Sequence, residues 1–141
     1  MTGEKRTTEL VDQVITLAAR TTEEIRVAIG ELDLTEPVAN LLWTVDPEAE
    51  PVPLRQLADR LHCDPSNVTL LAARLEEKGL AQRRPHPRDG RVRTLVLTEA
   101  GIAARNRLVA YAEQGSPFAA LSVAEQRALH ALLAKALERR A

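Results

Sequence analysis

The segment at residues 79–101, GLAQRRPHPRDGRVRTLVLTEAG, limits the fold of this chain more than any other part. Two short apolar runs, Leu80-Ala81 and Val92–Leu97, flank a loop that carries concentrated positive charge. Short apolar runs separated by Gly and Pro are typical of paired strands, so the segment predicts a β-hairpin. Five arginines lie within eleven residues, with Asp89 as the one acid among them: Arg83, Arg84, Arg88, Arg91 and Arg93. A hairpin with an arginine-rich loop is suited to reach into a nucleic-acid groove.

The chain before the hairpin predicts helices. Apolar or small residues recur at steps of three and four from Leu10 to Leu32, which predicts a long first helix that ends near Asp33. Thr35 is the expected N-cap of a second helix that runs to about Val45. Residues 47–53 hold three prolines and predict a loop with a short edge strand near Val52.

Two short helices joined by a tight turn come directly before the hairpin. Residues 54–61 form the first helix, and His62-Cys63 forms the turn. Asp64-Pro65 is an N-cap acid followed by a proline at the first helical position, which predicts the start of the second helix. Gly79 lies where a left-handed C-terminal cap belongs. This order, followed by a basic hairpin, predicts a winged helix–turn–helix.

Two further helices follow the hairpin. Thr98 is expected to cap a fifth helix that runs to about Gln114, and residues 115–117 interrupt it. Ser122 and Glu125 form a capping box at the start of a sixth helix. Aromatic residues make up only 2% of the chain, so the core is expected to be aliphatic side chains on closely packed helices. The predicted fold is mainly α with a small β-hairpin wing.

The second helix of the helix–turn–helix is expected to lie in the major groove of double-stranded DNA. Its outward-facing side chains Ser66, Asn67 and Thr69 carry hydroxyl and amide groups that can donate to and accept from base edges. The wing arginines are expected in the adjacent minor groove, because its negative potential favours a weakly hydrated guanidinium group.

These segments resemble the MarR family of transcriptional regulators. The resemblance is carried by residues 75–80 (LEEKGL), Arg83, Asp89-Gly90-Arg91 and residues 97–101 (LTEAG), all in the family's spacing. It implies one domain over residues 1–141, with the winged helix–turn–helix at about 35–98. Helices at about 7–33 and 98–141 would then interleave with those of a second copy, which implies a homodimer on a palindromic site.

The resemblance also assigns roles within the wing. It implies that Asp89 pairs with Arg91 and holds that arginine in a defined pose. Arg88 and Arg91 are the expected groove contacts, whereas Arg84 and Arg93 are expected to contact backbone phosphates.

Two further positions have roles that the resemblance leaves open. Arg83 matches a family position at the base of the strand and has either a DNA-binding or a structural role. The chain departs from the family at Leu70, where many members place an arginine. A leucine at this position is suited to contact a thymine methyl group.

A small-molecule ligand between the dimerisation helices and the winged lobes is also implied by the resemblance. Arg26 and Trp43 are the candidate contacts there; the alternatives are an ion pair of Arg26 with an adjacent acid and a core position for Trp43. Between Thr22 and Glu50, eight acids face one arginine. This excess either favours a cationic ligand or forms a solvated surface. Repression that the ligand relieves is the behaviour expected from the family.

Other functional classes find little support in the sequence. No histidine combines with a Ser or Cys and a carboxylate in a catalytic pattern, and there is no glycine-rich phosphate loop. We therefore expect no enzyme activity, no cofactor and no metal site. No apolar run approaches the roughly 18 residues of a membrane span, and the N-terminus lacks the order of a signal peptide. A cytoplasmic protein without membrane association is expected.

Two alternative functions stay open at this point. Cys63, the single cysteine, is either a packed thiol or a redox sensor whose oxidation would disturb the recognition helix. A winged helix can also be a protein–protein assembly module without an operator of its own. The arginine wing distinguishes these functions, because an assembly module does not need it and DNA binding weakens steeply with salt.

Overall fold

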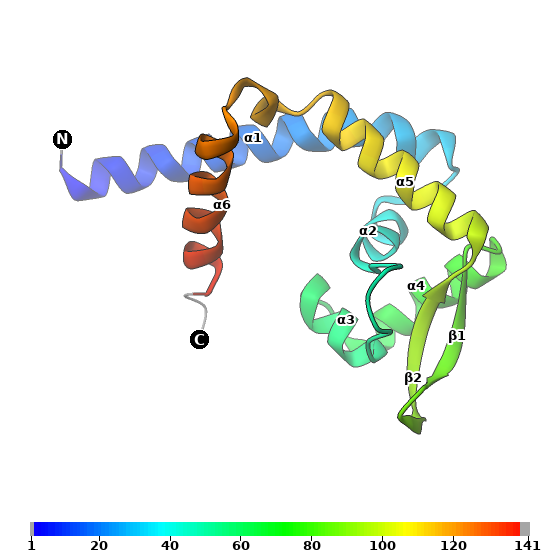
Figure 1. Cartoon of the computed structure of the whole chain (residues 1–141). Coiled ribbons are helices and arrows are strands. Elements are labelled where there is room, and N and C mark those ends of the chain that lie inside the picture. Colours follow the sequence, from blue (N-terminus) through cyan, green and yellow to red (C-terminus); the bar gives the residue numbers. More distant parts are fainter. Residues whose placement is uncertain (1, 139–141) are drawn as a thin grey trace.

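The structure of the chain, a computed structural model, describes residues 2–138. This part contains six α-helices, one 3₁₀ helix and one two-stranded antiparallel sheet (Figure 1). In chain order the elements are α1 (Gly3–Glu31), α2 (Glu36–Thr44), α3 (Leu54–Leu61), α4 (Pro65–Glu77), β1 (Ala81–His86), β2 (Asp89–Leu97), α5 (Glu99–Gln114), η1 (Pro117–Ala120) and α6 (Val123–Glu138). The predicted fold class, a mainly helical winged helix–turn–helix with a small hairpin, is confirmed.

The helices α2 to α6 begin at or next to the predicted places, but not every predicted cap uses its side chain. The Thr98 hydroxyl accepts a hydrogen bond from the first turn of α5 at 3.1 Å, and Ser122 and Glu125 form the predicted reciprocal capping box. Thr35 and Asp64 occupy N-cap positions with extended backbone, yet within residues 2–138 neither side chain makes a capping hydrogen bond. A proline in the first turn of α2 and of α4 removes one backbone donor there, so fewer N–H groups need a partner.

The core of the molecule lies in the winged lobe, which we define as residues 34–98, and continues into the C-terminal part of α1 and the middle of α5. Its largest fully buried side chains are aliphatic apart from one threonine: Leu41, Leu42, Leu57, Val68, Leu75, Thr94, Leu95 and Leu108. Burial of each large aliphatic side chain contributes roughly 1.5–3 kcal/mol to folding. This core holds α4 and the hairpin in one rigid unit.

The hairpin is longer than the apolar runs predicted. β1 and β2 pair from Ala81 opposite Leu97 to His86 opposite Asp89, with an irregularity next to Pro85. The Thr94 side chain is fully buried, and its hydroxyl donates to the Arg84 carbonyl at 2.9 Å. On the other side of β2, one isolated bridge joins Thr94 to Pro53. This single bridge lies where the sequence predicted a short edge strand near Val52.

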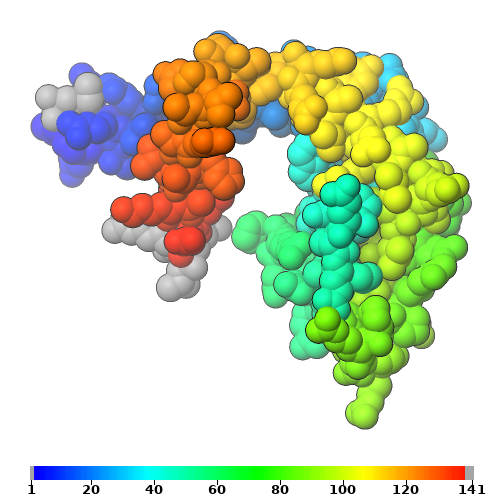
Figure 2. Space-filling view, viewed as in Figure 1, coloured from blue at the N-terminus to red at the C-terminus, as the bar shows by residue number. Residues whose placement is uncertain are grey.

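The terminal helices are far less buried than the lobe. The helix α1 begins four residues before the predicted position, and Ala28 is the only buried residue among its 29 residues. None of the described residues of α6 is buried. Figure 2 shows an arch, with α6 and the N-terminal half of α1 on one side of an open space and the winged lobe on the other.

Candidate nucleic-acid interface

Helix α4 turns one apolar face to the lobe and one polar face to solvent. Its buried residues are Val68, Ala72 and Leu75, which face α2 and α3. The residues that the sequence predicted as base contacts are all exposed: Ser66, Asn67, Thr69 and Leu70. The helix therefore presents these four side chains on its accessible face.

Thr69 and Leu70 offer two different kinds of contact to a base edge. The Thr69 hydroxyl donates to the Pro65 carbonyl at 3.0 Å, so its oxygen remains an acceptor for an amino group on a base edge. The Leu70 side chain is 66% exposed, which places an apolar group on the same face. Its contact with a thymine methyl group stays a prediction.

The five arginines are exposed, but most of them lie on strands. Arg83 and Arg84 lie on β1, and Arg91 and Arg93 lie on β2. Arg88 lies between the two strands. The prediction of an arginine-loaded loop was wrong in this respect. Backbone pairing continues through polar residues, because ladder hydrogen bonds do not depend on side-chain polarity.

Local partners orient two of these side chains. Arg84 donates from Nε and Nη2 to the Gln82 side-chain oxygen at 3.1 and 2.6 Å. Nε of Arg88 lies 3.3 Å from Oε1 of Glu50, in the loop between α2 and α3. Within residues 2–138, the guanidinium groups of Arg91 and Arg93 make no ion pair or hydrogen bond, so both are accessible to phosphates.

The predicted pairing of Asp89 with the Arg91 guanidinium is not present. Oδ1 of Asp89 accepts a hydrogen bond from the backbone N–H of Arg91 at 3.1 Å, and no ion pair among the described residues joins the two side chains. Asp89 therefore fixes the backbone of the turn, as an aspartate does in an Asx-turn, and leaves the Arg91 guanidinium group unconstrained.

Arg83 connects the wing to the recognition helix. Its side chain forms an ion pair with Glu76 near the end of α4, and its backbone N–H donates to the same carboxylate at 3.3 Å. The Arg83 and Glu76 side chains are about two-thirds buried, with exposed fractions of 37% and 34%. This geometry favours the structural role for Arg83, in which the pair fixes the angle between α4 and the wing.

A second connection joins the end of α4, the wing and the start of α5. The Thr98 hydroxyl donates to the Gly79 carbonyl at 2.6 Å, and the Thr98 backbone N–H donates to the Leu80 carbonyl at 3.0 Å. Gly79 has φ of +72°, the left-handed conformation expected of a C-terminal cap. A Cβ on Gly101 would overlap the Leu80 carbonyl oxygen, so only glycine allows α5 to start this close to the wing.

The two candidate ligand contacts lie outside the wing. Arg26 forms an ion pair with Glu23 one turn earlier on α1, at 3.3 Å, which is the alternative that its sequence context allowed. Trp43 is 40% exposed, so it is not a core residue of the described chain. Its carbonyl oxygen accepts a hydrogen bond from Nε of Arg105 on α5 at 3.1 Å.

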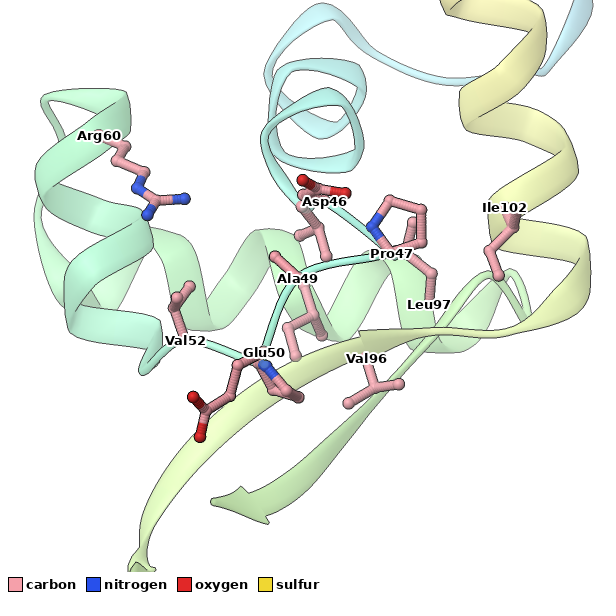
Figure 3. A pocket seen from close by; sticks show the side chains of 12 residues that line it. Asp46, Pro47, Ala49, Glu50, Val52, Arg60, Val96, Leu97 and Ile102 are labelled. Atoms are coloured by element: carbon pink, nitrogen blue, oxygen red, sulfur yellow. The ribbon is translucent and has the colours of Figure 1, made fainter. Parts of the chain in front are cut away.

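The surface also contains a pocket of about 220 Å³ within the winged lobe (Figure 3). It lies between the loop at residues 45–52, strand β2 and Ile102 on α5, with Asp46, Glu50 and Arg60 at its edge. In Figure 3 the Glu50 carboxylate is directed away from the pocket along β2. Neither Arg26 nor Trp43 lines this pocket.

A larger groove of about 1140 Å³ lies between α1 and α6. Its walls are predominantly aliphatic and include Leu10, Val14, Leu17, Leu129, Leu132 and Leu133. Arg26 and Trp43 are also absent from its lining.

Cys63 is partly buried and packs against the core of the lobe, directly after His62, whose φ is +54°. Among residues 2–138, no three His, Cys, Asp or Glu side chains converge as metal ligands would. No helix in the same part of the chain is both long and apolar enough to cross a membrane.

Comparison with known proteins identifies related sequences and folds. The sequence model of the MarR family matches residues 34–92, which contain α2, α3, α4 and most of the hairpin. No curated protein sequence matches the chain.

Several solved structures resemble the whole chain. CouR from Rhodococcus jostii RHA1, solved bound to p-coumaroyl-CoA, is 24% identical, with a TM-score of 0.73 and coverage of 88% of this chain and 86% of that chain. A MarR family protein from Bacillus stearothermophilus is 21% identical, with a TM-score of 0.73 and coverage of 98% and 97%. A point mutant of MepR from S. aureus, solved bound to an oligodeoxyribonucleotide, is 20% identical, with a TM-score of 0.60 and coverage of 94% and 96%. At these identities the likeness shows a common fold.

Proposed function

Because residues 34–92 of this chain are a domain of the MarR family of transcriptional regulators, we propose that the chain is a sequence-specific repressor. It binds a palindromic site in double-stranded DNA as a homodimer, and a small-molecule ligand relieves the repression. The observation that carries this proposal is the combination of an exposed polar face on α4 with five exposed arginines on the adjacent wing.

The proposed DNA contacts divide into two groups. Base contacts come from Ser66, Asn67, Thr69 and Leu70 on α4, because major-groove base edges discriminate sequence. Arg88 and Arg91 enter the minor groove, and Arg84 and Arg93 contact phosphates, because guanidinium groups suit both environments. The MepR complex with an oligodeoxyribonucleotide supports this use of the fold.

The terminal helices support the proposed homodimer. Large aliphatic side chains on both α1 and α6 are more than half exposed, among them Leu10, Val14, Leu132 and Leu137. A contiguous apolar surface of this kind marks an association site. A second copy that places its own α1 and α6 against this groove would bury both surfaces, and the two lobes would then meet successive major grooves about 34 Å apart.

The ligand is proposed to bind near α1, α2 and α5, with Arg26 and Trp43 as contacts. CouR, solved with p-coumaroyl-CoA, supports a small-molecule site in a protein of this fold. Neither residue lines the two cavities described above, so we propose that the partner chain completes the site. The ligand acts by changing the separation of the two recognition helices.

Selection of bound duplexes from a random DNA pool tests this proposal. We expect enrichment of one palindromic sequence, with half-sites about one helical turn apart. Binding to the selected duplex should also weaken steeply as salt rises, because the wing releases counterions from phosphates. Failure to enrich any sequence, together with binding that ignores ionic strength, would favour a protein–protein assembly module.

A further inference from the structure

Glu50 reaches the wing from outside the hairpin, and we propose that this residue sets the strength of DNA binding by offsetting the positive charge of the wing. It belongs to the loop between α2 and α3, and it lies far from its wing partners along the chain. The inference rests on the proposed DNA-binding function and adds a residue that opposes part of it.

The geometry places one carboxylate against two cationic or protonatable groups of the wing. Oε1 of Glu50 lies 3.3 Å from Nε of Arg88 and 3.8 Å from Nε2 of His86. The backbone N–H of Arg88 donates to Nδ1 of His86 at 3.1 Å, so the neutral ring carries its hydrogen on Nε2, toward Glu50. Glu50 is therefore part of the wing tip in space, although not in sequence.

This arrangement leaves Arg88 available for DNA but reduces the net positive charge at that point of the wing. Glu50 approaches Nε of Arg88, and the Arg88 side chain remains 80% exposed, so the arginine is still accessible to DNA. A guanidinium group beside a carboxylate attracts phosphate less strongly, and the carboxylate itself repels the DNA backbone. Glu50 thus orients Arg88 and offsets its positive charge in the same contact.

Phosphate electrostatics contribute to DNA binding of any sequence, whereas base contacts from α4 are added only at the operator. A negative charge on the wing therefore weakens binding to both kinds of duplex by a similar factor. Glu50 thus limits the overall affinity of the wing for DNA.

The test compares Glu50→Gln with the wild type on a random-sequence duplex and on the selected duplex, across a salt series. We expect Glu50→Gln to bind the random duplex roughly threefold more tightly at low ionic strength. Its salt slope should be steeper by up to about 0.9, and its affinity for the selected duplex should rise by a similar factor. Glu48→Gln is the matched control, because Glu48 is an exposed acid of the same loop and makes no ion pair within residues 2–138.

A second comparison shows whether the effect of Glu50 on DNA binding acts through Arg88. In an Arg88→Gln background, Glu50→Gln should lose most of its effect, because the carboxylate no longer has that arginine to neutralise. The proposal is overturned if Glu50→Gln binds the random duplex no more tightly than the wild type, if Glu48→Gln has an equal effect, or if the full effect persists without Arg88. Failure of the proposed function looks different, since the wild type itself would then bind no duplex at low salt.

Discussion

The winged lobe and the terminal helices differ in how far their apolar side chains are exposed to solvent. In the lobe, Leu42, Leu57 and Leu75 are almost completely buried by side chains of the same chain. On α6, Leu132 and Leu137 are 65% and 79% exposed, and no described residue of the helix is buried. The apolar side chains of the lobe are therefore covered within one chain, whereas those of α6 are left accessible to a partner such as the proposed second copy.

This difference divides the proposed function between two regions. The lobe fixes the position of α4 relative to the wing, through its core and through the pair of Arg83 with Glu76. In the proposed homodimer, the distance between the two lobes depends on how the terminal helices of both copies pack. Sequence recognition within a half-site is therefore a property of one chain, and recognition of a palindrome is a property of two.

The largest effect is expected from a charge on the apolar face of α6. Leu132→Asp should abolish the homodimer and lower the affinity for a palindromic duplex at least a hundredfold, about 2.8 kcal/mol, because a single lobe contacts only one half-site. Sedimentation and DNA titration measure the two effects. Arg127→Asp, on the opposite face of α6, is the control and should remain dimeric. A dimeric Leu132→Asp variant would remove the distinction between the two regions.

Within the lobe, the sharpest steric constraint lies at Gly101. Gly101→Ala places a methyl group on the Leu80 carbonyl oxygen, and backbone atoms cannot yield as a flexible side chain does. We expect a loss of about 1–3 kcal/mol in the free energy of unfolding, measured with urea. Gly90→Ala is the control, because a Cβ there meets nothing within 4 Å. Equal stability of the two variants would contradict the close approach of α5 to the wing.

The wing should contribute to DNA binding without affecting assembly. Arg91→Ala is expected to lower operator affinity ten- to a hundredfold, about 1.4–2.8 kcal/mol, while the protein stays dimeric. The measurement is a titration at fixed salt, with Arg127→Ala as the control. An unchanged affinity would show that Arg91 does not contact DNA and would withdraw the wing assignment.

The smallest effect concerns the start of α6, whose capping box needs no partner chain. The backbone N–H and then the side chain of Ser122 lower the pKa of Glu125 by hydrogen bonding to its carboxylate. The associated stabilisation is present above the ordinary carboxyl pKa and is lost as pH falls through the lowered pKa of the folded state. Ser122→Ala should raise the pKa of Glu125 in an NMR titration while the dimer persists. The backbone N–H of residue 122 persists in this variant, so an unchanged pKa would mean that the Ser122 side chain does not contribute.

Much of the fold follows from local sequence patterns. Apolar periodicity placed the helices, and Gly79 was predicted correctly as a left-handed cap, because both are properties of a few neighbouring residues. Thr35 and Asp64 occupy the predicted N-cap positions, but among the described residues neither side chain makes a capping hydrogen bond, and a proline in each first turn reduces the number of donors there. The extent of the strands was also underestimated, because backbone pairing continued through the arginines.

The candidate site was less predictable, because its details depend on contacts across long sequence separations. The sequence identified α4 and the arginines by their types and order. It did not reveal that Glu76 binds Arg83 or that Glu50 binds Arg88, because each acid lies on a different element from its partner. Glu50 belonged to an acidic run with no internal pattern, so only the folded structure connects it with the wing.

The number of chains bound to one operator shows whether a homodimer recognises the palindrome. The mass of the complex with a short palindromic duplex, measured by sedimentation or native mass spectrometry, should correspond to two chains per duplex, with half-sites about ten base pairs apart. The free protein should have twice the mass of one chain. A stable monomer that occupies the palindrome as a single chain with undiminished affinity would contradict the account.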